Sequence, residues 1–131
     1  MAAQLTQLDG GIGYVEAAFV KGALQAATLT NAAGEKLKPT NESGSKALAS
    51  IDLGPDLIGS NPNPAQGYPI VSFSWILLYN TGNGDRVDSL KKVFDYTLSD
   101  QAQAMAPELG YVSLPPEVMA RGREKLASIG K

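Results

Sequence analysis

The side chains that most often carry catalysis at neutral pH are missing from this chain. Its 131 residues include no His and no Cys, which excludes imidazole bases, thiolate nucleophiles and the usual zinc ligand sets. Asp52 with Asp56, and Asp85 with Asp88, could be considered as acid/base or metal pairs. Each pair is better explained by a loop or a helix start, because no third oxygen ligand follows at a suitable spacing. We therefore predict no catalytic residues, no metal, no cofactor and no enzyme activity.

Three short motifs suggest phosphate-binding loops on first inspection. Gly10–Gly13 does not fit the dinucleotide pattern and precedes an expected strand, while Gly82–Asp85 lacks the Lys-Ser/Thr ending of a P-loop. Ser43-Gly44-Ser45-Lys46 stands at an expected helix start, where backbone amides and hydroxyls can hold an anion. Helix entry with solvated hydroxyls explains the same residues more simply. Both interpretations of residues 43–46 remain open at this point.

Composition limits the class of partner. The chain is 44% hydrophobic and 18% charged, with a net charge of −2. This is the composition of one globular domain, and it offers no basic excess for nucleic acid. No apolar run reaches the length of about 18 residues that a membrane span needs. Residues 1–8 lack a cationic start and an apolar core, so we expect no signal peptide in this chain.

Periodicity and breaker residues predict an alternating order of helices and strands. Helices are expected over 2–8, 16–22, 40–50, 85–98, 100–109 and 115–129, and strands over 12–15, 27–30, 36–38 and 68–80. Residues 52–68 are rich in Gly, Pro and Asn, which predicts a long surface connection and a junction between two substructures.

The expected strand 68–80 carries the most information about a site. One face is apolar throughout (Val71, Phe73, Trp75, Leu77, Tyr79), whereas the other places Ser72 and Ser74 between apolar ends. A central strand covered by helices on both sides is apolar on both faces. The two serines therefore indicate a crossover between lobes or the wall of a cleft. Tyr14 is a further candidate because it precedes a helix, where open α/β sheets place their crevices, although a packing role is the simpler alternative.

Four segments, taken in order, resemble one family. They are Gly11-Ile12-Gly13-Tyr14-Val15-Glu16, residues 68–78 (YPIVSFSWILL), residues 90–96 (LKKVFDY) and residues 109–115 (LGYVSLP). Together they resemble periplasmic phosphate-binding proteins, the substrate-binding subunits of phosphate-specific ABC transporters. The resemblance covers essentially the whole chain.

The resemblance implies an α/β fold, the C-terminal portion of a two-lobed periplasmic-binding-protein fold of type II (Venus-flytrap). Residues 1–67 would form part of lobe 2, and residues 68–131 part of lobe 1. The family's phosphate ligands lie in early loops and in an Arg-x-x-x-Ser-Gly-Thr segment, and neither region is present here. No ligand is therefore assigned, and Tyr14, Ser72 and Ser74 are the residues expected nearest the cleft.

The function implied by the resemblance is phosphate capture by lobe closure and delivery to an ABC permease, in the periplasm or another extracytoplasmic space. Phosphate would bind only together with the missing N-terminal part. The alternative is a truncated relative that serves as a non-binding accessory or interaction subunit of a larger complex. Neither half of the chain has enough strands to close a sheet. We therefore expect pairing with the missing part, with a second copy by strand or lobe exchange, or with another protein chain.

Overall fold

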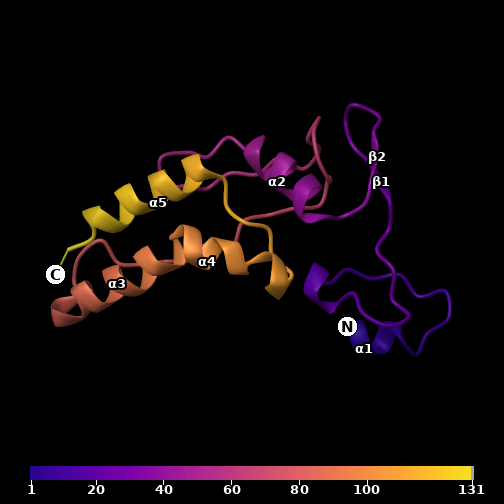
Figure 1. Cartoon of the computed structure of the whole chain (residues 1–131), viewed down its shortest axis with the longest axis horizontal. Coiled ribbons are helices and arrows are strands. Elements are labelled where there is room, and N and C mark those ends of the chain that lie inside the picture. The colour runs from indigo at the N-terminus through magenta and orange to yellow at the C-terminus, as the bar shows by residue number, and fades with distance from the viewer. Residues whose placement is uncertain (131) are drawn as a thin grey trace.

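Helices make up most of the regular structure. The structure is a computed structural model that describes residues 1–130. Its α-helices are α1 (Ala2–Leu5), α2 (Asn41–Ala49), α3 (Val87–Thr97), α4 (Asp100–Met105) and α5 (Pro116–Ser128), and its 3-10 helices are η1 (Ala17–Phe19), η2 (Gly84–Arg86) and η3 (Pro107–Leu109). Two short strands, β1 (Leu29–Thr30) and β2 (Lys36–Leu37), form an antiparallel pair. Figure 1 shows α5 lying above α3 and α4, with the N-terminal segment at the opposite end of the molecule from the C-terminus.

A buried asparagine shapes the turn between β1 and β2. Asn31 is 5% exposed, and its Oδ1 accepts hydrogen bonds from the backbone N–H groups of Ala33 and Glu35. Its Nδ2 donates to the carbonyl oxygen of Ala65 at 3.1 Å. The side chain thus closes the turn and ties it to the loop that follows α2. A buried amide with all these partners avoids the cost of an unpaired polar group.

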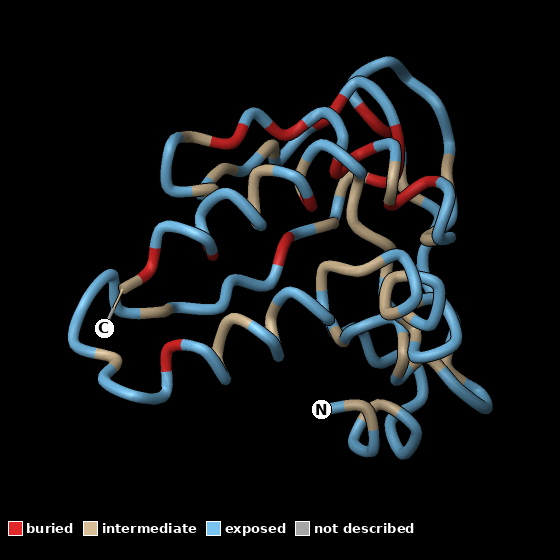
Figure 2. The backbone as a smooth tube through the Cα atoms, turned by 60° about the vertical axis from the view of Figure 1, so that its left-hand side comes forward, coloured by how far each residue is buried: buried red, intermediate tan, exposed pale blue. Residues whose placement is uncertain are grey.

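Two small apolar clusters form the core. The first cluster consists of Leu48, Ile51, Leu53 and Phe73, with Leu57, Val71, Val112, Leu114 and Val118 packed against it. The second cluster consists of Val87, Leu126 and Ile129, with Leu78 and Phe94 against it. In Figure 2 the buried stretches gather around α2 and the loop after it, while the N-terminal segment carries none.

The molecule exposes far more surface than its mass requires. Its accessible surface is 9338 Å², whereas a folded monomer of 13.7 kDa exposes about 6,600 Å². Large apolar side chains make up part of the excess, among them Leu8, Ile12, Tyr14, Phe19, Ile70, Ile76, Leu77, Tyr79 and Tyr111.

The strand predictions are wrong at two places. Residues 12–15 form no strand, and Ile12 is 98% exposed rather than buried. Residues 68–80 also form no strand in the described chain. A strand needs a neighbour to accept and donate its backbone hydrogen bonds, and residues 1–130 supply none to these two segments. The structure is therefore a small mixed helix/strand domain without the predicted α/β sheet, and it does not display two lobes.

The helix predictions fare better because helices depend on local signals. Ser99 caps α4 by accepting a hydrogen bond from the Ala102 N–H (3.2 Å), and Gly110 ends η3 at φ 84°. Pro116 opens α5, as expected for a first helical position. The helices predicted over 2–8 and 16–22 are shorter, reduced to α1 and η1.

None of the helices in residues 1–130 combines the length and the apolar character needed to cross a membrane.

The N-cap of α2 provides a test of the fold. Thr40→Ala removes the hydroxyl that accepts from the Ser43 N–H at 3.1 Å, and we expect the free energy of unfolding to fall by about 1 kcal/mol. Thr40→Ser keeps the hydroxyl and should lose less than half as much. Urea unfolding followed by circular dichroism measures both. Equal losses in the two variants would contradict the capping role.

Candidate functional site

The predicted site residue Tyr14 lies on the surface of the N-terminal segment. Its side chain is 80% exposed. It belongs to residues 11–16, which rest on α1, since a Cβ at Gly13 would lie 2.8 Å from Leu5 Cδ1. The short strand that we expected before Tyr14 is absent, so no sheet edge positions the phenol.

The segment around Tyr14 contacts residues 110–111, which are nearly a hundred residues away and belong to another of the segments that resemble phosphate-binding proteins. The Tyr111 hydroxyl donates to Glu16 Oε2 at 3.5 Å. Gly110 faces Ala18 so closely that an added Cβ would lie 2.7 Å from the Ala18 Cβ. Residues 11–18 and 110–111 are therefore neighbours, which the sequence order alone does not reveal.

The two predicted serines lie on the extended segment after Pro69. Both are exposed, and the Ser72 hydroxyl donates to the carbonyl oxygen of Phe73 at 3.1 Å. No hydrogen bond within residues 1–130 joins Tyr14 to Ser72 or Ser74. The structure thus shows the three predicted residues as surface groups, Tyr14 on one segment and the two serines on another, and their common cleft stays a prediction.

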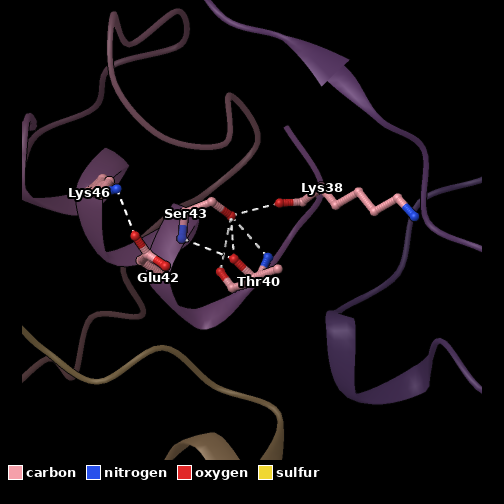
Figure 3. Close-up of polar contacts among 5 residues, drawn as sticks. All are labelled: Lys38, Thr40, Glu42, Ser43 and Lys46. Atoms are coloured by element: carbon pink, nitrogen blue, oxygen red, sulfur yellow. Dashed lines mark hydrogen bonds and ion pairs between the residues drawn. The ribbon is translucent and has the colours of Figure 1, made fainter. Parts of the chain in front are cut away.

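The start of α2 forms a capping box between Thr40 and Ser43. Figure 3 shows Ser43 at the centre: its N–H donates to Thr40 Oγ1, the Thr40 N–H donates to Ser43 Oγ at 2.9 Å, and Ser43 Oγ donates to the Lys38 carbonyl oxygen at 2.7 Å. The hydroxyl and the amide that an anion would use are already engaged. Helix entry is therefore the better interpretation of residues 43–46.

Lys46, the cation of that motif, is paired within its own helix. Its Nζ lies 2.7 Å from Glu42 Oε1. The hydrogen bond and the charge of Lys46 lower the pKa of Glu42, and the same contact with Glu42 raises the pKa of Lys46. Both side chains are largely exposed, so the pair adds little to stability.

A shallow pocket lies between the end of α2, the loop after it and the start of α5. It has a volume of about 320 Å³ and is lined by Leu48–Leu53, Pro115, Glu117, Val118 and Arg121. Arg121 Nη2 donates to the carbonyl oxygens of Leu53 (2.9 Å) and Gly54 (2.7 Å). The guanidinium thus holds the loop against α5. Sequence reasoning missed this contact because it joins residues more than 60 positions apart.

A second pocket, of about 270 Å³, lies between α3 and α5. Two of its three basic side chains contact the protein: Lys91 Nζ donates to the Ala127 carbonyl oxygen at 2.9 Å, and Arg123 Nε lies 3.5 Å from Asp95 Oδ1. Neither pocket is lined by Tyr14, Ser72 or Ser74. No cluster of acidic side chains within residues 1–130 is arranged to hold a metal ion.

Comparison with known proteins confirms the resemblance to phosphate-binding proteins. The chain is 33% identical over 128 residues to the phosphate-binding protein PstS of Pasteurella multocida, and 32% identical over 126 residues to that of Haemophilus influenzae. Each match covers 92% of this chain and 37% of the relative. The PstS of Methanocaldococcus jannaschii is 27% identical over 135 residues. No family model matches the chain.

The chain spans about a third of the length of the curated relatives it matches. That share agrees with the C-terminal part predicted from the motifs. The relatives' names describe binding proteins.

A substitution at Gly67 tests how closely the loop after α2 packs against that helix. It has φ +80°, and a Cβ there would collide with the Ser43 carbonyl oxygen and the Ala47 amide nitrogen. We expect Gly67→Ala to lower the free energy of unfolding by about 2–5 kcal/mol, from left-handed strain and overpacking together. Gly82→Ala is the matched control, because Gly82 has φ +88° and open space around it. It should lose only about 1–2 kcal/mol. Similar urea midpoints for the two variants would show that the loop is not packed on α2.

Proposed function

We propose that this chain is the C-terminal part of the phosphate-binding subunit of an ABC-type phosphate uptake system. The observation that carries the proposal is its similarity to proteins named PstS over 92% of its own length. Residues 1–67 contribute to lobe 2 and residues 68–131 to lobe 1 of a two-lobed Venus-flytrap clamp. The clamp works outside the cytoplasmic membrane and delivers phosphate to the permease.

In this proposal the chain forms one side of the cleft and does not supply most of the groups that bind phosphate. Phosphate recognition needs several convergent donors, usually backbone amides, hydroxyls and an arginine. Two candidate sources of such donors are already engaged: the Ser43 N–H and hydroxyl are used in the capping box, and Arg121 Nη2 donates to carbonyl oxygens. Tyr14, Ser72 and Ser74 stay exposed, and they are the groups available to face a ligand once the other lobe is in place.

The isolated chain should therefore bind phosphate very weakly or not at all. Calorimetric titration of residues 1–131 with phosphate, and with sulfate as the comparison anion, should give no heat of binding at micromolar concentrations. Micromolar phosphate affinity in the chain alone would contradict the claim that the gripping groups lie elsewhere.

Phosphate binding should appear when the chain is restored to a complete protein. We suggest a chimaera in which this chain replaces the matched third of the Pasteurella multocida phosphate-binding protein. The chimaera should bind phosphate, and Tyr14→Phe, Ser72→Ala or Ser74→Ala should weaken binding about tenfold wherever the lost hydroxyl donates to the anion. Tyr96→Phe and Ser89→Ala, on the exposed surface of α3, are the matched controls. A chimaera that folds but binds no phosphate would favour the accessory-subunit alternative. Unchanged affinity in all three variants would remove these residues from the cleft.

A further inference from the structure

The residues just after α5 are tied to the loop that leads into α3. Asn83 Nδ2 donates to the Tyr79 carbonyl oxygen at 2.9 Å and to the Gly130 carbonyl oxygen at 2.7 Å. The Gly130 N–H donates in turn to the Asn80 carbonyl oxygen at 2.8 Å. We call these three hydrogen bonds the α5 latch. Figure 1 shows the end of α5 beside the start of α3, where the latch lies.

Asn83 also has a neighbour that makes its side chain chemically reactive. Of the asparagines in the chain, only Asn83 is followed by glycine. In an Asn–Gly pair the glycine backbone nitrogen can attack the asparagine Cγ, because glycine has no Cβ to obstruct the approach. A new C–N bond forms, and the side-chain nitrogen leaves as ammonia together with the proton of the glycine N–H. Water then opens the cyclic imide, which leaves aspartate or isoaspartate.

The folded chain holds Asn83 away from the geometry of this attack. The five-membered imide ring needs the Gly84 nitrogen nearly eclipsed with the Asn83 Cβ. The Asn83 ψ of −12° instead brings the Gly84 nitrogen close to eclipsing the Asn83 nitrogen. That backbone is restrained, since the Asn83 carbonyl oxygen accepts from the Arg86 N–H at 3.2 Å. The side chain is restrained by the latch, and both must turn before the ring can close.

Conversion of Asn83 to aspartate would remove the donor on which the latch depends. An ionised carboxylate only accepts hydrogen bonds, and here it would face the Tyr79 and Gly130 carbonyl oxygens. Acceptors that face one another lose their hydrogen bonds and repel. The helix dipole favours a negative charge at the start of η2. Within residues 1–130, however, the Asn83 side chain makes no capping hydrogen bond, so the lost latch decides the outcome.

We propose that Asn83 is a site of spontaneous deamidation, that the α5 latch protects it, and that the modified residue releases the end of α5. The reaction needs only water, and it adds a negative charge to a chain whose net charge is −2. The inference concerns this chain alone and does not depend on phosphate binding.

Peptide mapping by mass spectrometry tests the site. The full chain is incubated at mildly alkaline pH, folded and in urea, and the Asn83 peptide is followed for the mass change from amide to acid. Conversion should be about tenfold slower in the folded chain, because local opening must precede the attack. Absence of conversion in urea would overturn the site, and equal rates in both conditions would overturn the protection.

Two substitutions at Gly130 test the latch without changing Asn83 or Gly84. Gly130→Pro removes the N–H that donates to the Asn80 carbonyl oxygen, and deamidation of the folded chain should become about fivefold faster. Gly130→Ala is the matched control, since it keeps the N–H and its Cβ would lie at an ordinary 3.7 Å from the Asn80 oxygen. Circular dichroism verifies that both variants stay helical. Equal deamidation rates in the two variants would overturn the role of the latch.

Asn83→Asp reproduces the product and tests its effect. In hydrogen exchange, peptides that cover residues 126–130 should exchange about tenfold faster in Asn83→Asp than in the unmodified chain. Asn83→Ala removes the donor without adding a charge, so its effect should be smaller. Equal exchange in Asn83→Asp and the unmodified chain would overturn the release of α5.

Discussion

A β-strand cannot satisfy its own backbone, and this constraint accounts for most of what the chain does and does not form. A helix pairs its N–H and C=O groups within one segment, so α2, α3 and α5 form from residues close together in sequence. A strand takes its partners from elsewhere. Residues 70–79 have the apolar character of a strand but find no neighbour among residues 1–130. The large exposed surface of the molecule and its open apolar side chains follow from the same shortage of partners.

Helix α2 organises the part of the chain that does pack. In its capping box, Thr40 and Ser43 form reciprocal hydrogen bonds between side chain and backbone. The Ser43 carbonyl oxygen accepts a hydrogen bond from the Tyr68 N–H at 2.9 Å. Gly44 lies against Val112, and Leu48 enters the first cluster. One short helix thus joins the loop after it, the segment before α5 and the core. This packing explains why a Ser-Gly-Ser-Lys sequence that could hold an anion is used for structure instead.

The helices were predictable from sequence because their signals are local: Thr40 and Ser99 as caps, Pro116 at a first helical position, and Gly110 after η3. The predicted strands at 12–15 and 68–80 failed because neither segment finds a strand partner among residues 1–130. Long-range contacts were beyond prediction for a different reason. Arg121 donates hydrogen bonds to the Leu53 and Gly54 carbonyl oxygens, and Gly67 packs closely against α2. Neither contact produces a spacing pattern in the sequence. The candidate site has the same difficulty, since a cleft lined by Tyr14, Ser72 and Ser74 would need a second wall.

The packing also limits where the proposed clamp can bend. The first cluster joins Leu48, Ile51 and Leu53, which precede residue 67, to Phe73, which follows it. Separating them would expose four buried apolar side chains at about 1.5–3 kcal/mol each. By contrast, the segment before α2 meets the C-terminal half through lighter contacts, such as the hydrogen bond from Tyr111 to Glu16 and the contact between Gly110 and Ala18. Residues before α2 are also tied to the loop after it, by the hydrogen bonds from Asn31 Nδ2 to Ala65 and from the Ala32 N–H to Pro64. A lobe boundary at residue 67 therefore divides residues that share one apolar cluster, and a motion there would have to expose that cluster.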